Sequence, residues 1–192
     1  MKRVAVLVSG RGSNLQALLD AIAAGRLAAR VVYVASNHGS VPALERAAKA
    51  GVPSGVFVAK KGHRAEAQGA MADAIKAARP DVVVLAGFDR ILEDVVFDKL
   101  AGIPMLNIHP SLLPAFGGPG MVGDRVHEAV LKSGARESGC TVFRVERGDV
   151  DGGEIVVQRR VPVLPGDDVR ALADRVLAQE HVAIVEAVGI VA

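Results

Sequence analysis

Short apolar runs rich in β-branched residues alternate with alanine-rich segments along the whole chain. The run Val82-Val83-Val84-Leu85 is apolar at every position, which is typical of a central strand covered on both faces. The segment 64–78 instead has the alanine content and spacing of a helix. This alternation predicts an α/β fold, a mostly parallel Rossmann-like open sheet with helices on both faces. The predicted strands are 4–8, 31–35, 81–86, 105–109, 140–145 and 155–163, and the predicted helices are 15–24, 41–50, 64–78, 125–132 and 168–188.

The composition excludes several classes of protein. With 51% hydrophobic residues in 192, the chain can bury a sizeable core, which argues against disorder. The formal charge of +2 comes from 23 basic and 21 acidic residues without a basic block, so no nucleic-acid partner is expected. The single cysteine, Cys140, excludes an internal disulfide and a thiolate metal cluster. No segment has the length of a membrane span, so we expect no membrane partner and a cytoplasmic location.

The organisation of the chain is that of one continuous domain. No low-complexity linker and no internal repeat interrupts residues 1–192, so we expect a single domain over this range. The loop 110–123 is rich in proline and glycine and is long for a compact α/β connection. Loops of this length are often functional.

A glycine-containing segment, Ser9-Gly10-Arg11-Gly12-Ser13-Asn14-Leu15, leads from the first predicted strand into the first predicted helix. The free N–H groups at such a helix start bind anions, above all phosphate. The glycines let the backbone approach a ligand, and Ser13 or Asn14 is expected to cap the helix. Leu15 replaces the third glycine of a dinucleotide fingerprint, and no acidic residue follows the second strand. We therefore favour a phosphate monoester over a turn without a ligand.

Two polar residues, Asn107 and His109, lie near the end of the otherwise apolar strand 105–109. Side chains alternate along a strand, so both point to the same side. Pro110 ends the ladder, which places the pair at the carboxyl end of a parallel strand, where open α/β sheets bind their ligands. Asn can donate to a developing oxyanion and His can relay a proton, so we favour a catalytic pair over a buried structural one.

The turn Gly148-Asp149-Val150-Asp151-Gly152-Gly153 carries two carboxylates between two predicted strands. Turn chemistry alone accounts for this composition. His109, however, lacks a carboxylate to orient it, and Asp149 and Asp151 are both candidates. The spacing does not match a calcium loop, so we favour a carboxylate that serves His109 and expect no metal.

Several other residues are interpreted as structural. Cys140 is expected to be a small core residue. His63, His127 and the pair Glu180-His181 lie in predicted helical segments, where a solvent-exposed side chain is the simpler expectation.

Six motifs appear in the order in which they occur in one known family. They are Val8-Ser9-Gly10-Arg11-Gly12-Ser13-Asn14-Leu15-Gln16-Ala17, Val84-Leu85-Ala86-Gly87-Phe88 with Arg90-Ile91-Leu92, Asn107-Ile108-His109-Pro110-Ser111-Leu112-Leu113-Pro114, Gly139-Cys140-Thr141-Val142, Asp151-Gly152-Gly153 and Gln179-Glu180-His181. On these residues the chain resembles the folate-dependent glycinamide ribonucleotide formyltransferase family over nearly its whole length. The resemblance implies formyl transfer from 10-formyltetrahydrofolate to the amine of phosphoribosylglycinamide in purine biosynthesis, by a monomer or homodimer without a metal.

The resemblance also implies roles for particular residues. Residues 1–100 would form the phosphate and ribonucleotide-binding half, and residues 101–192 the catalytic and folate-binding half. The catalytic trio would be Asn107, His109 and Asp151. Phosphoribosylglycinamide would be bound by Gly12, Ser13, Asn14 and Glu180, and the folate by Arg64, Asp89, Arg90, Ile91, Leu92, Asn107, Asp149 and Val150.

The chain departs from the family pattern at three places. Asp89 stands where many members have methionine, Phe143 where many have histidine, and the loop 117–121 differs from a shorter form that contains histidine. A carboxylate at position 89 would alter the surroundings of the folate. Two alternative functions stay open: a formyltetrahydrofolate hydrolase, which needs no amine substrate, and a non-catalytic module that binds a phosphate ligand.

Overall fold

The computed structural model describes residues 1–191, and Ala192 lies outside the described residues. Residues 1–191 form seven strands and six helices. The strands are β1 (Lys2–Val8), β2 (Ala29–Ser36), β3 (Ser54–Val56), β4 (Val82–Leu85), β5 (Met105–His109), β6 (Glu137–Arg144) and β7 (Ile155–Pro162). The helices are α1 (Ser13–Ala23), α2 (Pro42–Lys49), α3 (Arg64–Ala77), α4 (Asp94–Lys99), α5 (Asp124–Ser133) and α6 (Val169–Val191). Each strand and helix predicted from the sequence is present, while β3 and α4 were not predicted.

The strand order is β3-β2-β1-β4-β5-β6-β7. β1 pairs in parallel with both β2 and β4, and β2 pairs in parallel with β3. β6 and β7 form an antiparallel pair. The predicted α/β class with a mostly parallel open sheet is therefore confirmed, with an antiparallel pair at one edge.

The chain divides into two compact units, Met1–Leu106 with Val191 and Asn107–Ile190. The boundary falls inside β5, close to the division predicted between residues 1–100 and 101–192. The expectation that residues 1–192 form one domain stays a prediction.

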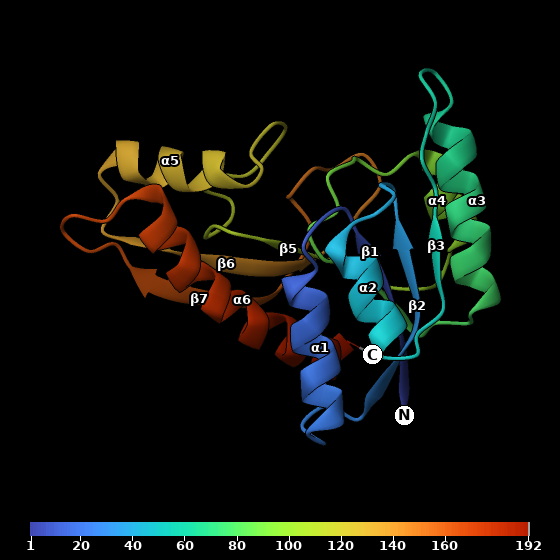
Figure 1. Cartoon of the computed structure of the whole chain (residues 1–192). Coiled ribbons are helices and arrows are strands. Elements are labelled where there is room, and N and C mark those ends of the chain that lie inside the picture. The colour runs from blue at the N-terminus through green and yellow to red at the C-terminus, as the bar shows by residue number, and fades with distance from the viewer. Residues whose placement is uncertain (192) are drawn as a thin grey trace. The chain divides into compact units, whose positions relative to one another are not determined.

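The first unit is built on the central strands β1 and β4. Val4 to Val8 of β1 are fully buried, and so are Val82, Val83 and Val84 of β4. Each of the valine and leucine side chains among them contributes about 1.5–3 kcal/mol by leaving water. Figure 1 shows α1 beside α2 and α3 beside α4 within this unit. The loops that leave β1, β2 and β4 at their carboxyl ends carry the polar residues discussed below.

The second unit contains the end of β5, the loop 110–123, α5, the β6–β7 pair and most of α6. Figure 1 shows β6 and β7 as adjacent arrows of opposite direction. The core includes the fully buried Cys140 and Val142 of β6, and Leu172 and Ile184 of α6. Cys140 is therefore a core residue, as predicted.

Candidate active site

The His109 imidazole is buried at the end of β5, and its two nitrogens face different partners. Nε2 lies 2.8 Å from the carbonyl oxygen of Phe116. A carbonyl oxygen can only accept, so Nε2 carries the proton of this hydrogen bond. Nδ1 lies 3.6 Å from Oδ2 of Asp151, an ion-pair distance that is too long for a hydrogen bond. The Nδ1 side of the ring therefore remains for proton-transfer chemistry.

The Asp151 side chain is held in place beside His109 by the backbone. Only 11% of this side chain is exposed, and its Oδ2 accepts a hydrogen bond of 2.9 Å from the amide of Gly118. The φ angle of Asp151 is 63°, in the left-handed region that Asp and Asn adopt more readily than most residues. A buried carboxylate at this place can orient the imidazole and stabilise positive charge that develops on it.

The loop segment 116–118 contacts both members of this pair. Phe116 accepts the hydrogen bond from His109, and Gly118 donates to Asp151. Between them, Gly117 has no room for a side chain: a Cβ would lie 2.5 Å from Cδ2 of Leu113 and 3.3 Å from Cβ of Asp151. The absence of a side chain at Gly117 thus allows the loop to lie close to the carboxylate.

The second carboxylate of the turn, Asp149, has a different environment. It is exposed, and a Cβ at Gly152 would collide with both of its carboxylate oxygens. The composition of the turn left Asp149 and Asp151 as alternatives, and the family resemblance implied Asp151. The structure brings Asp151 to His109. Val150 between them is half-buried.

Asn107 and Glu180 are the other site residues predicted in the second unit. Asn107 is half-buried, whereas Leu106 and Ile108 on either side of it are buried. By strand alternation it shares a face with His109. Glu180, in α6, is half-buried, and its charge acts on the Cys140 thiol. The expectation that Glu180 and His181 are solvent-exposed was therefore wrong, because α6 is partly covered along this stretch.

His127 of α5 was also expected to be exposed, and this was wrong. Its residue is 5% exposed, because it lies on the face of α5 that carries the buried Val126 and Val130. Within residues 1–191 its buried Nδ1 has no hydrogen-bond partner. Burial lowers the pKa of His127 and outweighs the Asp124 carboxylate, which acts to raise it, and His109 lowers it further. A second imidazole therefore lies within electrostatic range of His109.

In the first unit, α1 begins without a side-chain cap. The N-cap residue is Gly12, with φ 70°, and no side chain caps the helix. The expectation that Ser13 or Asn14 caps α1 was wrong, because Gly12 takes the cap position and Ser13 begins the helix. A Cβ at Gly12 would lie 2.6 Å from Cβ of Ala43. The first-turn N–H groups are thus without a side-chain cap, which suits an anion.

Arg46 of α2 holds this loop, and sequence reasoning missed it. Its Nε donates to the carbonyl oxygen of Arg11 at 2.9 Å, and its Nη1 donates to Oε1 of Gln16 at the same distance. The amide of Ala43 also donates to the carbonyl oxygen of Gly10. Nothing in the sequence links α2 to this loop, because the contact depends on how α2 packs beside α1.

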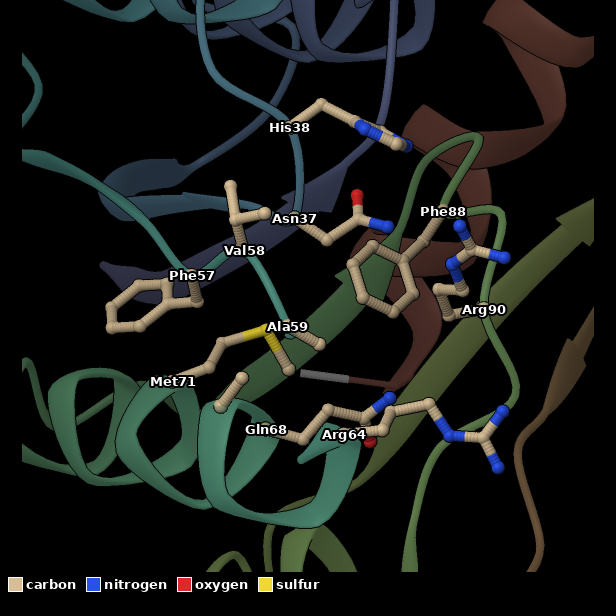
Figure 2. Close-up of a pocket in the computed structure, with 11 residues that line it drawn as sticks. Asn37, His38, Phe57, Val58, Ala59, Arg64, Gln68, Met71, Phe88 and Arg90 are labelled. Atoms are coloured by element: carbon tan, nitrogen blue, oxygen red, sulfur yellow. The ribbon is translucent and has the colours of Figure 1, made fainter. Parts of the chain in front are cut away.

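A cavity of about 100 Å³ in the first unit is lined by two of the predicted folate residues, Arg64 and Arg90. Figure 2 shows the Phe88 ring directed into the space among the labelled side chains. Arg64 also forms an ion pair with Glu93. The remaining lining is mainly apolar, so the cavity suits a ligand with an aromatic part and an anionic part.

The segment 91–93 beside this cavity is held by Gln68 of α3. The buried Gln68 side chain donates from Nε2 to the carbonyl oxygen of Ile91 at 3.0 Å and accepts at Oε1 from the amide of Glu93 at 2.7 Å. Ile91 is 55% exposed and Leu92 is half-buried. Sequence reasoning missed Gln68, because its helical position alone does not show which loop it contacts.

Asp89 is engaged by side chains from the loops after β1 and β2. Its Oδ1 accepts from Nδ2 of Asn37 at 2.7 Å and from Oγ of Ser9 at 3.2 Å. Its Oδ2 lies 2.9 Å from Nε2 of His38. Partial burial acts to raise the pKa of Asp89, but the hydrogen bonds from His38 and Asn37 outweigh it and hold this pKa below its ordinary value. The carboxylate therefore joins three loops of the first unit.

Comparison with known proteins agrees with these features. The sequence profile described as Formyl transferase matches residues 2–188. The chain belongs to the formyl transferase family. This formyl transferase is 40% identical to the phosphoribosylglycinamide formyltransferase of Escherichia coli (strain K12), over 93% of the chain and 81% of that protein. The crystal structure of glycinamide ribonucleotide transformylase 1 from Symbiobacterium toebii superposes with a TM-score of 0.90 at 40% identity, covering 99% of this chain and 87% of that one.

A longer protein is also similar to this formyl transferase. The trifunctional purine biosynthetic protein adenosine-3 of Drosophila pseudoobscura pseudoobscura is 47% identical over the whole chain. The chain spans only 14% of the length of that protein.

Two features are absent from residues 1–191 of this formyl transferase. In this range no group of three or more His, Cys, Asp and Glu side chains is arranged to hold a metal ion. None of the helices in the same residues combines the length and the apolar character needed to cross a membrane.

Proposed function

We propose that this formyl transferase is a phosphoribosylglycinamide formyltransferase of de novo purine biosynthesis. The observation that carries the proposal is the pair of the buried His109 and the largely buried Asp151, 3.6 Å apart, on a chain similar to the phosphoribosylglycinamide formyltransferase of Escherichia coli over most of its length. The formyl donor is 10-formyltetrahydrofolate. The enzyme acts in the cytoplasm as a monomer or homodimer, without a nucleic-acid or membrane partner.

The reaction is acyl transfer between two nitrogens. The amine of phosphoribosylglycinamide attacks the formyl carbon, and a new C–N bond forms while the carbonyl oxygen becomes negative. The tetrahedral intermediate then breaks its bond to N10 of the folate, which leaves with a proton that originated on the attacking amine. No atom beyond those of the two substrates is consumed.

The trio Asn107, His109 and Asp151 supplies the chemistry of this step. The Asn107 amide and the Nδ1–H of a protonated His109 stabilise the negative oxygen of the intermediate. Asp151 stabilises the imidazolium and relays the proton toward N10. Losing one donor of this kind typically costs about 2.7–4 kcal/mol of transition-state stabilisation.

The substrate sites follow from the remaining residues. Gly12, Ser13 and Asn14 at the start of α1 bind the phosphate, supported by the helix N-terminus without a side-chain cap. Glu180 contacts the glycinamide end. The residues that we assign to the folate are those that the family resemblance implies: Arg64, Asp89, Arg90, Ile91, Leu92, Asn107, Asp149 and Val150. The apolar cavity with Arg64 and Arg90 in its lining supports an aromatic ligand that carries carboxylates.

The test is formyl transfer by the purified chain. With both substrates present, formylated phosphoribosylglycinamide and tetrahydrofolate are expected in equal amounts. Release of formate from 10-formyltetrahydrofolate without the amine would instead identify a hydrolase. Binding of both substrates with neither product would identify a non-catalytic module.

The matched variants are His109→Ala and His63→Ala. His63 is an exposed histidine that pairs only with Glu66 among the ion pairs of residues 1–191, so its loss should leave turnover unchanged. His109→Ala should lower kcat by roughly 100- to 1,000-fold. Near-normal turnover in His109→Ala would refute the proposed mechanism.

A further inference from the structure

Two side chains of the β6–β7 pair, Thr141 and Gln158, face each other directly across the strands. Thr141 is fully buried, and its Oγ1 donates to the carbonyl oxygen of Ser111 at 2.7 Å. The same oxygen accepts from the amide of Leu113 at 3.1 Å and from Nε2 of Gln158 at 2.9 Å. A hydroxyl has one donor and two acceptor positions, so the hydroxyl of Thr141 is fully used.

Gln158 extends this network to the turn that follows β5. Its Nε2 also donates to the carbonyl oxygen of Leu113 at 3.1 Å. The turn itself is closed by Oγ of Ser111, which donates to the carbonyl oxygen of Ala115 at 2.6 Å. Segment 111–115 is therefore attached to the β6–β7 pair by the side chains of Thr141 and Gln158. Each of these side chains forms hydrogen bonds with the turn, and the two also bond to each other.

The turn ends at the group that holds the catalytic imidazole. Phe116 follows Ala115 directly, and its carbonyl oxygen accepts the hydrogen bond from Nε2 of His109. The position of this carbonyl depends on the turn, and the turn depends on Gln158 and Thr141. Because the carbonyl oxygen of Phe116 can only accept, its hydrogen bond with His109 keeps the proton of a neutral imidazole on Nε2.

We propose that Gln158 is a positioning residue for formyl transfer, which acts through Thr141 and the turn 111–116 to keep His109 in the Nε2–H tautomer. The inference rests on the proposed function for its effect on turnover, but not for its effect on the imidazole. Gln158 itself contacts the turn and Thr141 and is assigned no contact with the reacting atoms.

The first variant is Gln158→Met, which keeps the approximate length of the side chain and removes its donors. The carbonyl oxygen of Leu113 and the hydroxyl of Thr141 then each lose a hydrogen bond, and the turn loses its attachment to β7. We expect kcat to fall by up to about 100-fold, because small misplacements of catalytic groups have effects of this size. KM for both substrates should stay within about twofold, since Gln158 does not bind them.

The matched control is Arg160→Met on the same strand. Its side chain is 63% exposed and pairs with Glu137, and it takes no part in the hydrogen bonds between Gln158, Thr141 and the turn that are described above. This variant should keep the kcat of the unmodified enzyme. A kcat for Gln158→Met that equals that of Arg160→Met would overturn the proposal.

A second readout follows the imidazole directly. In the unliganded protein, ¹⁵N chemical shifts of the His109 ring at a pH where it is neutral distinguish the two tautomers. The wild-type ring should be in the Nε2–H form, and Gln158→Met should raise the share of the Nδ1–H form. A fall in kcat with an unchanged tautomer would also overturn the proposal, because the loss of turnover would then not arise from a change in His109.

Position 141 keeps the proposal testable if Gln158→Met does not fold. Thr141→Val removes the hydroxyl at nearly constant volume, whereas Thr141→Ser retains it. We expect Thr141→Val to reproduce the changes in kcat and tautomer, and Thr141→Ser to restore both. Equal effects of Val and Ser would contradict the proposal, since the hydroxyl would then be irrelevant.

Failure of the proposed function gives a different pattern. If the wild-type chain does not transfer a formyl group, but Gln158→Met still changes the tautomer, the proposed function fails and the positioning of His109 by Gln158 stands. If the wild-type chain transfers the group and the tautomer does not respond, the positioning inference alone fails.

Discussion

Oδ2 of Asp151 lies 3.6 Å from Nδ1 of His109, while the other ring nitrogen donates to the carbonyl oxygen of Phe116. The imidazole is thus fixed through Nε2 and faces the carboxylate through Nδ1. The gap between Nδ1 and Oδ2 exceeds hydrogen-bond length, so Nδ1 is not committed to Asp151 in the unliganded protein. When the ring is protonated, a reacting oxygen or a bridging water can therefore compete with Asp151 for the proton on Nδ1.

The charge of Asp151 can be removed without disturbing the backbone. Asp151→Asn keeps an oxygen that can accept from Gly118, and Asn tolerates the φ of 63° at this position. We expect the melting temperature to stay within a few degrees. We expect kcat to fall by roughly 100- to 1,000-fold, because an amide cannot stabilise the imidazolium in the transition state. Steady-state kinetics together with thermal unfolding check this, and a kcat within a few-fold of wild type would remove Asp151 from the mechanism.

Gly117 provides a steric test of the loop that holds both residues. In Gly117→Ala the new methyl group would meet Leu113 at 2.5 Å and the Cβ of Asp151 at 3.3 Å, so the loop or these side chains must move. We expect a loss of about 1–3 kcal/mol in the free energy of unfolding, together with a lower kcat. Gly39→Ala is the control, because a Cβ at Gly39 meets nothing within 4 Å. Denaturant unfolding of both variants makes the comparison, and equal stability would contradict the assigned packing.

The elements predicted from sequence were those whose signal is local. Apolar runs such as 82–85 and alanine-rich runs such as 64–78 each carry enough periodicity to indicate a strand or a helix. β3 spans only Ser54–Val56 and α4 only Asp94–Lys99, which is too short for either period to be recognised. Burial of His127 was missed for a related reason, since its side of α5 is decided by packing partners and not by its own type.

The site residues show the same difference: some were predicted from local sequence information, and others depend on contacts between distant parts of the chain. The spacing of Asn107 and His109 on one strand predicted that both side chains point to the same side, because strand geometry is local. The choice of Asp151 over Asp149 depended on the shape of a turn in which Asp151 adopts a positive φ. Gln158 has no sequence signal at all, because its partner Thr141 is defined by the register of β6 against β7.

Cys140 reports on the opening of the second unit. Burial first, and then the negative charge of Glu180, raise the pKa of this thiol to about 12, although Arg159 acts to lower it. At pH 8 the folded protein therefore holds almost no thiolate, and the side chain is fully buried. We expect a thiol reagent to label Cys140 slowly in the native protein and rapidly in guanidinium chloride. Fast labelling of the native protein at pH 8 would contradict this burial.

The same thiol makes stability depend on alkaline pH. An unfolded cysteine has a pKa of about 8.5, whereas in the fold the value is about 12. The folded state therefore favours the protonated thiol, and this contribution is complete below pH 8.5 and is lost as the pH rises from there toward 12. Cys140→Ser should show a shallower decline of the unfolding free energy across that range than the wild type.

The ion pair of Asp167 and Arg175 predicts a separate effect at acid pH. Nη1 of Arg175 donates to Oδ2 at 2.7 Å and Nη2 to Oδ1 at 2.9 Å, and the amide of Leu164 also donates to Oδ2. The hydrogen bonds from Arg175 and Leu164 lower the pKa of Asp167 to about 2. Because this value lies below that of an unfolded aspartate, the stabilisation is present above about pH 4 and is lost as the pH falls through about 2.

Arg175→Gln tests the cause of that shift. Removing the guanidinium should move the pKa of Asp167 from about 2 back toward about 4, which an NMR titration of its carboxyl carbon measures. The unfolding free energy of the variant should then fall less steeply between pH 4 and pH 2 than that of the wild type. Arg170→Gln is the control, because Arg170 lies on the same helix, is 91% exposed and approaches Asp174 only at 4.0 Å. An Asp167 pKa that stays near 2 in Arg175→Gln would assign the shift to the backbone amide of Leu164 instead.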